Sequence, residues 1–161
     1  VSEKTRINGK GYDYYHFIAT DNEFTPEYEN NIISGMEEAI FRNGNRKMLI
    51  YGDDGIHNGK LATHYMVTRE WCDALGYFMP INFQRHCFCD NYLTVLGIKS
   101  KKIAYCESAK LTHNHIIINP LASTDEYQRK AYSPEFYEED KRRYEYLLKT
   151  QLQDDINKLL R

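Results

Sequence analysis

The chain has 161 residues, a hydrophobic fraction of 42% and a formal net charge of −2, values typical of one soluble-type globular unit. This charge excludes a general basic surface, so the composition does not support tight, sequence-independent binding of DNA or RNA. No apolar stretch approaches the roughly 20 residues that a membrane helix needs. We therefore expect no membrane partner and a cytoplasmic location.

The first predicted elements are a helix end and a strand. Residues 1–10 are polar and run into glycines, a pattern typical of the last turns of a helix. The aromatic and β-branched run 14–19 predicts a strand that leads directly into Asp21, Asn22 and Glu23. This strand is therefore expected to deliver carboxylates to a loop.

A helix and a second strand are expected next. Thr25 and Pro26 predict a helix start, and the helix should run to about Phe41 before the break at 43–45. The apolar run 48–51 then predicts a buried strand that ends at Asp53 and Asp54. A strand, helix, strand order favours parallel strands that share one carboxyl edge, which would make Asp21 and Asp53 neighbours.

The remaining chain predicts a mixture of short strands and helices, followed by a charged carboxyl-terminal segment. Its amphipathic pattern indicates one or two outer helices. The expected elements are a short apolar run over 63–68, helices over 69–75 (ended by Gly76) and 90–96 (ended by Gly97), strands over 102–105 and 110–118, and the helical segment 133–161.

Two motifs have spacings that suit a divalent metal. Asp21 and Glu23 are two acids on a tight turn, which can bind Mg²⁺ or Mn²⁺ beside phosphate oxygens. The same acids also suit a plain turn before a helix, whose dipole they complement. His113 and His115 lie two residues apart on a predicted strand, so both point to one face, as paired metal ligands often do.

Further candidates lie in the central segment. Asp90 is expected at a helix start, where it either caps the helix or acts as a general base beside a cleft. Of Asp53 and Asp54, one is expected to bind substrate hydroxyls and the other only to shape the turn. Four free cysteines are expected, since none of their spacings matches a zinc or redox pair.

These segments together resemble a known family. The order TDNE, then YGDDGIHNGKLATHYMVTREWCDALGYFMP, then RHCFCDN, then LTHNH is similar to glycosyltransferase-like proteins of bacteriophages and bacteria. Those proteins have the nucleotide-diphospho-sugar transferase (GT-A) fold. The resemblance implies an α/β fold with a mostly parallel sheet flanked by helices, and a host-cytoplasm location if a phage encodes the chain.

The resemblance also implies a role for each matching residue. Asp21, Glu23, His113 and His115 would hold Mn²⁺ or Mg²⁺, although this chain has Asp-Asn where the family usually has adjacent aspartates. Asp90 would be the base that deprotonates the acceptor.

Four other matching positions would line the sugar and acceptor side. They are Asp53, Asp54, His64 and Asn91. The implied partners are a nucleoside diphosphate sugar and an acceptor that is a glycan, a protein or modified DNA.

The family normally begins with strands that bind the nucleoside. We therefore expect either an absent amino-terminal half or a reduced, self-associating relative. The expected organisation is a glycosyltransferase-like α/β domain over 1–130 and a helical extension over 131–161. Two alternatives remain open: a non-catalytic carbohydrate-binding or assembly module, and a metal-dependent phosphoesterase or nuclease, which the lack of a basic track disfavours.

Overall fold

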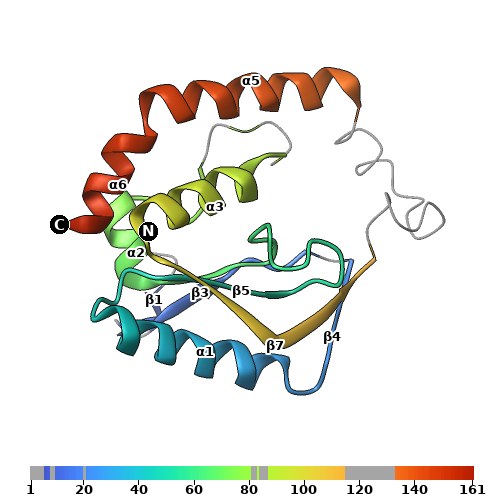
Figure 1. The fold of residues 1–161 in the computed structure, drawn as a ribbon, viewed down its shortest axis with the longest axis vertical. Coiled ribbons are helices and arrows are strands. Elements are labelled where there is room, and N and C mark those ends of the chain that lie inside the picture. The colour runs from blue at the N-terminus through green and yellow to red at the C-terminus, as the bar shows by residue number, and fades with distance from the viewer. Residues whose placement is uncertain (1–5, 8–9, 20, 81–82, 84–86, 115–132) are drawn as a thin grey trace.

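The computed structural model describes residues 6–7, 10–19, 21–80, 83, 87–114 and 133–161, and these form three layers (Figure 1). Helix α1 (Tyr28–Asn43) covers one face of a five-stranded sheet, and four helices lie on the other. These four are α2 (Arg69–Leu75), α3 (Cys89–Ser100), α5 (Pro134–Thr150) and α6 (Leu152–Leu160). None of the helices in the described part combines the length and apolar character needed to cross a membrane.

The sheet is mixed, so the expected α/β class holds while the expected mostly parallel sheet is corrected. Its strand order is β3-β6-β5-β7-β4, and among these strands the β5–β7 pairing is parallel while the other three pairings are antiparallel. The strands are β3 (Tyr14–His16), β4 (Asn22–Phe24), β5 (Leu49–Asp53), β6 (Met66–Thr68) and β7 (Ile103–His113).

The difference from the prediction has a simple cause. Strands β3 and β5 do run in the same direction, but β6 lies between them and runs antiparallel to both. The loop 54–65 leads from β5 to β6 without a crossover helix, and such a connection returns the chain antiparallel. Local sequence patterns do not show that a later strand will be inserted between two earlier ones.

Alternating side chains of β5 build two separate cores. Leu49 and Tyr51 pack with buried side chains of α2, α3, α5 and α6, whereas Ile50 packs under α1 with Ile32 and Met36. This alternation is what a strand with helices on both faces requires. The predicted apolar run 48–51 is therefore confirmed as a central strand.

Helix boundaries follow local signals in two cases. Gly44 ends α1 in the left-handed conformation, with φ of 64°. Helix α2 begins after Thr68, whose side chain accepts a hydrogen bond from the Trp71 backbone nitrogen, and ends at Gly76 with φ of 83°. The predicted limits of α2 are confirmed at both ends.

Helix α3 does not end at Gly97, which corrects the prediction. It continues to Ser100, and Lys101 takes the left-handed conformation with φ of 58°. A Cβ atom at Gly97 would lie 2.7 Å from the Ile103 Cβ, so this glycine allows α3 to approach β7 closely. The glycine is there for packing between elements and not for ending the helix.

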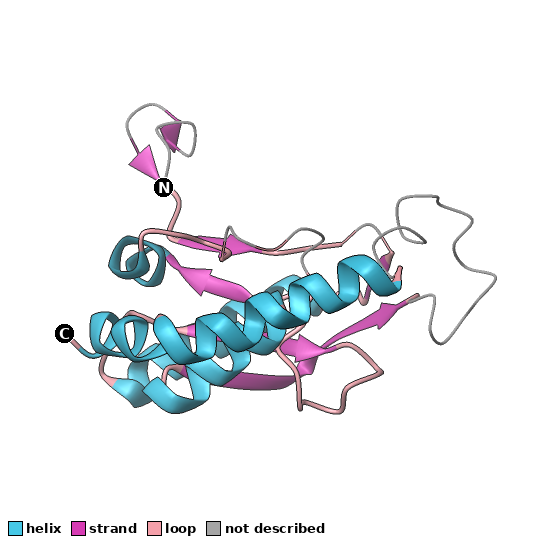
Figure 2. Cartoon of the chain, turned by 90° about the horizontal axis from the view of Figure 1, so that it is seen from above, coloured by secondary structure: helices cyan, strands magenta, loops and turns pink. Residues whose placement is uncertain are grey.

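The two ends of the chain also differ in how well local patterns predicted them. The predicted helix over 1–10 is wrong, because Arg6–Ile7 (β1) pairs antiparallel with Lys10–Gly11 (β2), apart from the main sheet (Figure 2). In the sequence these strands flank Asn8 and Gly9, a dipeptide that favours hairpins. The carboxyl-terminal prediction is confirmed, since α5 and α6 pack on α2 and α3.

Candidate functional site

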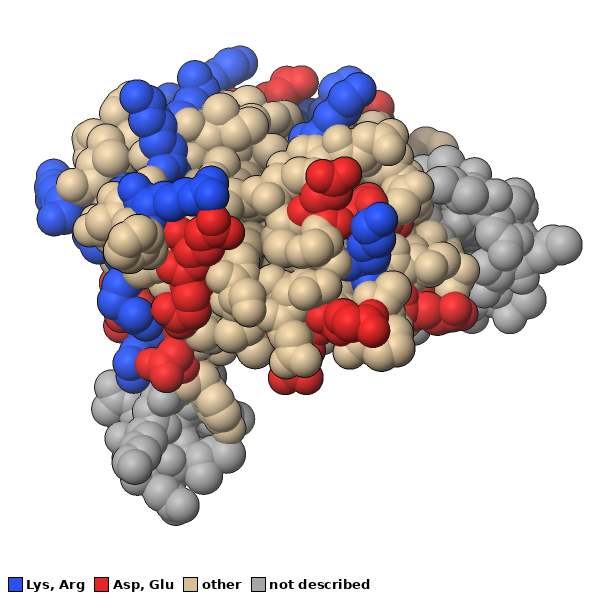
Figure 3. All heavy atoms as spheres, turned by 60° about the horizontal axis from the view of Figure 1, so that its bottom comes forward, with Lys and Arg blue, Asp and Glu red and all other residues tan. Residues whose placement is uncertain are grey.

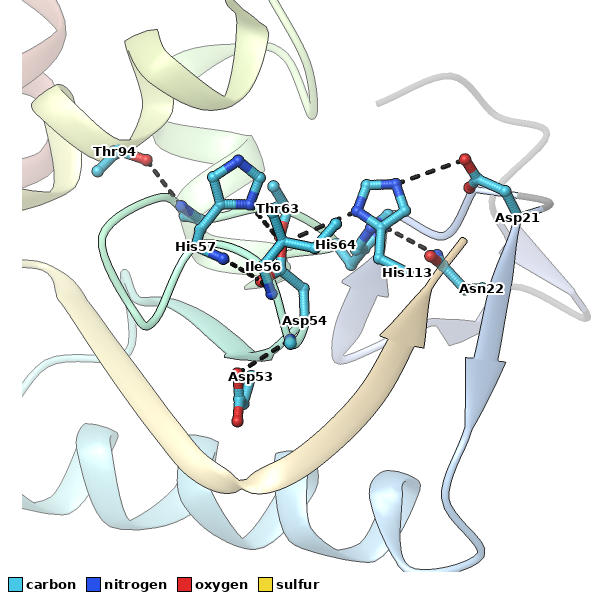
Figure 4. A network of polar contacts seen from close by, with 12 residues as sticks. Asp21, Asn22, Asp53, Asp54, Ile56, His57, Thr63, His64, Thr94 and His113 are labelled. Atoms are coloured by element: carbon cyan, nitrogen blue, oxygen red, sulfur yellow. Dashed lines mark hydrogen bonds and ion pairs between the residues drawn. The ribbon is translucent and has the colours of Figure 1, made fainter. Parts of the chain in front are cut away.

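A polar cluster forms where three segments meet at one end of the sheet (Figure 4). The segments are the start of β4, the loop that follows β5, and the end of β7. Asn22 and His113 are directly opposite one another in the β4–β7 pairing, so their side chains share a face. This register joins residues that are far apart in the sequence.

Asp54 is the most fully bonded member of the cluster. Its Oδ1 accepts hydrogen bonds from the backbone nitrogens of Ile56 and His57, at 3.0 and 2.8 Å, and its Oδ2 accepts from Thr63 Oγ1 at 2.8 Å. The same Oδ2 lies 2.6 Å from His57 Nδ1. Burial alone would raise the pKa of Asp54, but hydrogen bonds from His113 and His57 hold it well below its ordinary value. Asp54 is therefore a buried carboxylate that organises its neighbours.

His64 is buried, uncharged and conformationally strained. Its φ is 48°, a left-handed value that costs a non-glycine residue energy and that is often found at functional sites. Burial, with a smaller effect from the charge of His113, lowers its pKa to about 4. The Asn22 amide is 2.9 Å from Nδ1, an orientation in which Nδ1 accepts and the proton resides on Nε2. His64 Nε2 is buried and has no hydrogen-bond partner among the described residues.

Asp21 and His113 lie beside this histidine. His113 Nε2 is 3.4 Å from Asp21 Oδ2, and its Nδ1 is 3.8 Å from Asp54 Oδ2. The His64 and His113 rings meet edge to face, with centroids 4.6 Å apart. The other oxygen of Asp21 is buried without a hydrogen-bond partner in the described part of the chain. An unpaired buried carboxylate oxygen is costly, which points to a ligand that satisfies it.

Asp90 is electrostatically coupled to the same cluster. It lies in the first turn of α3, just after Phe88, whose φ of 66° is also left-handed. Burial raises the pKa of Asp90 above its ordinary value, nearby His57 and His113 oppose this rise, and Asp54 adds to it. A raised pKa makes a carboxylate a stronger proton acceptor than an ordinary aspartate, which suits a general base.

The structure thus brings together four of the predicted site residues, which come from separate places in the sequence: Asp21, Asp54, His64 and His113. The charges of Asp54 and His113 also act on Asp90, in the first turn of α3.

Other predicted residues lie elsewhere. Glu23 is exposed and accepts a hydrogen bond from Asn114, because on β4 it points to the face opposite Asn22. Asp53 points away from the cluster and accepts from the Gly55 backbone nitrogen at 3.0 Å, so Asp21 and Asp53 are not the expected neighbours (Figure 4). Asn91 is half-buried beside Asp90 in α3. His115 lies outside the described residues.

The described residues bring together only part of the predicted metal site. Asp21 and His113 are in contact, but Glu23 faces away from them. Among the described residues, no group of three or more histidine, cysteine, aspartate or glutamate side chains is arranged to hold a metal ion.

Sequence reasoning missed the residues that hold the central loop in place. His57 contacts Asp54, and Thr63 donates to the same carboxylate. Thr94 Oγ1 accepts from the Ala62 backbone nitrogen at 3.0 Å and donates to the Asp90 carbonyl oxygen at 2.6 Å. One sequence signal was available for His57, namely a histidine three residues after an acid in a loop that follows a strand.

A separate groove of about 610 Å³ lies between α1 and β7. Gly35, Arg42, Cys106 and Lys110 are among its lining residues, none of which belongs to the polar cluster. The polar cluster is therefore a candidate site because of the chemistry of its side chains, and this groove is not part of it.

Comparisons of the chain with models of protein families, with curated proteins and with solved structures found no match.

Proposed function

We propose that this protein transfers a sugar from a nucleoside diphosphate donor to an acceptor hydroxyl at the polar cluster. The supporting observation is that Asp21, Asp54, His64 and His113, which the resemblance drew from separate motifs, lie together in one cluster. The charges of this cluster also act on Asp90. A cluster of titratable groups at the end of a sheet, with the pKa values of Asp54 and His64 lowered and that of nearby Asp90 raised, is typical of a catalytic site.

In this mechanism Asp90 is the general base. It removes the proton of the acceptor hydroxyl while the oxygen attacks the anomeric carbon and the diphosphate departs with the electrons of the broken bond. His64, which is uncharged and carries its proton on Nε2, donates a hydrogen bond to a sugar hydroxyl or a phosphate oxygen. Asp54 keeps the loop between β5 and β6 in place.

The first test is thermal unfolding of the protein with a panel of nucleoside diphosphate sugars, each with and without Mn²⁺ or Mg²⁺. A ligand at a hundred times its dissociation constant should stabilise the folded state by about 2.7 kcal/mol. We expect one nucleotide class to raise the midpoint. If no donor raises it under either condition, the transferase proposal is wrong.

Two pairs of variants locate the chemistry. Asp90→Asn should reduce transfer by about 100-fold or more while sparing donor binding, because only the base is lost. Asp73→Asn, an exposed aspartate on α2, is its control. Asp21→Asn should weaken the metal-dependent part of donor binding, whereas Glu23→Gln, on the other face of β4, should not. If Asp90→Asn turned over the donor at the wild-type rate, Asp90 would not be the general base.

A non-catalytic carbohydrate-binding module is the second candidate. The outward position of Glu23 favours it, since Asp21 is then the one acid of the Asp-Asn-Glu motif that faces the cluster. This candidate predicts binding of a glycan without turnover of any donor. A nuclease gains little support, because the face on the α1 side carries interspersed charges of both signs and shows no continuous basic track (Figure 3).

A further inference from the structure

We propose that Asn22 and His64 form a recognition site for hydroxyl groups of the transferred sugar, with Asn22 as the positioning residue that keeps the ring proton of His64 on Nε2. The inference rests on the proposed function and deepens it, because it assigns the sugar, and not the diphosphate, to this part of the polar cluster.

The ring of His64 is held in one orientation by contacts on several sides. Its Nδ1 lies 2.9 Å from the Asn22 amide nitrogen, and the Phe17 ring is stacked on it with an interplanar angle of 5°. The backbone is fixed as well, because the His64 carbonyl oxygen accepts a hydrogen bond from His16 Nε2 at 3.0 Å. These contacts come from β3, from the residue that follows it and from β4, so the ring has little freedom to turn.

Asn22 determines which nitrogen of this ring carries the proton. An amide nitrogen only donates hydrogen bonds, so the Nδ1 atom that faces it must present a lone pair. The proton of the neutral ring is then on Nε2, and a ring protonated on both nitrogens would lose the bond to Asn22. The register of β4 against β7, which places Asn22 opposite His113, holds the amide at this point.

The pair leaves one donor and one acceptor unused. His64 Nε2 and Asn22 Oδ1 are both buried, and neither has a hydrogen-bond partner within the described part of the chain. Each unpaired group costs free energy, so a ligand that satisfies both is favoured. A hydroxyl group can accept from Nε2 and donate to Oδ1, whereas an ionised phosphate oxygen can only accept.

The charges of the cluster also favour an uncharged ligand beside His64. The neighbouring His113 lies between two carboxylates, with its Nε2 3.4 Å from Asp21 Oδ2 and its Nδ1 3.8 Å from Asp54 Oδ2 (Figure 4). These carboxylates would repel a phosphate group at this place. The hydroxyl groups of a sugar meet no such repulsion.

Nitrogen NMR of the histidine rings tests the positioning role without any ligand. The His64 signals are identified by their loss in His64→Gln. We expect wild-type His64 to be the Nε2–H tautomer, and its Nδ1 to gain a proton in Asn22→Asp, because a carboxylate only accepts. Glu23→Gln, on the other face of β4, should keep the wild-type tautomer. Wild-type His64 protonated on Nδ1, or an Nδ1 that stays unprotonated in Asn22→Asp, would overturn the proposal.

The same spectra test the class of ligand. Glucose, galactose, mannose and N-acetylglucosamine, each at about 100 mM to fill a site of millimolar affinity, are compared with inorganic pyrophosphate at matched ionic strength. We expect at least one sugar to shift the His64 Nε2 resonance in the wild-type protein and not in Asn22→Asp, and pyrophosphate to leave it unchanged.

Two results of the ligand test would overturn the proposal. They are a shift of the His64 Nε2 resonance by pyrophosphate, and the lack of a shift by every sugar. If a sugar binds at His64 while no nucleoside diphosphate sugar is turned over, the transferase proposal fails and the hydroxyl site stands.

Discussion

At the scale of single residues, the clearest constraint is the contact between Gly52 and β7. The parallel β5–β7 pairing shifts register between Gly52 and Asp53, whose partners are Cys106 and Lys110. A Cβ atom at Gly52 would lie 2.2 Å from the Ala109 carbonyl oxygen. The bulge that this register shift creates therefore depends on a residue without a side chain.

We predict that Gly52→Ala destabilises the protein by about 2–4 kcal/mol, because the strands must separate to admit the methyl group. The control is Gly44→Ala, where φ is +64° and a Cβ atom would have no neighbour within 4 Å. That change should cost only about 1 kcal/mol, from the left-handed conformation. Urea unfolding followed by the fluorescence of buried Trp71 measures both. Equal losses would show that the contact with β7 is not the cause.

At the scale of secondary-structure elements, one buried carboxylate of α6 accepts hydrogen bonds from two other parts of the molecule, in addition to the apolar packing of this helix. Asp155 is fully buried and accepts hydrogen bonds from the hydroxyls of Tyr77, at 2.6 Å, and Tyr92, at 2.9 Å. Gln151 adds a third bond at 2.9 Å. Since Tyr77 follows α2 and Tyr92 lies in α3, this residue holds three helices together.

We predict that Asp155→Ala lowers the free energy of unfolding by about 2–4 kcal/mol, because buried tyrosine hydroxyls lose their acceptor. The adjacent Asp154 offers a matched control, since its side chain is 63% exposed and pairs with Lys158 at the surface. Asp154→Ala should change stability by less than about 0.5 kcal/mol. A comparable loss in both variants, measured by urea unfolding, would contradict the bridging role.

Most elements could be predicted from the sequence because their signals are local. Helix α2 illustrates this, since the Thr68 cap and the Gly76 stop act within a few residues of the helix. The insertion of β6 between β3 and β5 could not be predicted, because it depends on pairing between distant segments. Gly97 was misjudged for a related reason, since its role appears only when α3 meets β7.

The candidate site shows the same division. Local patterns identified Asp53 and Asp54 together, but only the fold of the loop decides that Asp54 enters the cluster and Asp53 does not. The strand period explains why Glu23 faces away once the Asn22–His113 register is known. His57 was missed because its importance comes from a hydrogen bond and not from a recognised motif.

At the scale of the whole molecule, the buried histidine makes stability depend on pH. His64 has a pKa of about 4 in the folded protein, below the ordinary histidine value of 6.5, so the unfolded chain binds more protons between these values. Stability should therefore fall as pH decreases through this window. From pH 7 to pH 5 we expect a loss of about 2 kcal/mol from this group.

The test compares urea unfolding of the wild-type protein and His64→Gln at both pH values. The variant should lose most of this dependence, although His16, whose pKa burial also lowers, will retain a part. Asp54 does not confuse the comparison, because its folded pKa lies well below the window. An unchanged pH dependence in His64→Gln would show that this histidine is not the cause.

The pairing of β4 with β7 also has a consequence for synthesis on the ribosome. Glu23 and Asn114, which meet beside this pairing, are 91 positions apart in the chain. During translation β4 emerges before its partner strand, which follows only after α1, β5, β6, α2 and α3 have been made. Contacts of such long separation form late. Asp21 and Asn22 should therefore stay hydrated while the central layers assemble, and the nascent protein should gain its polar cluster as one of its final folding events.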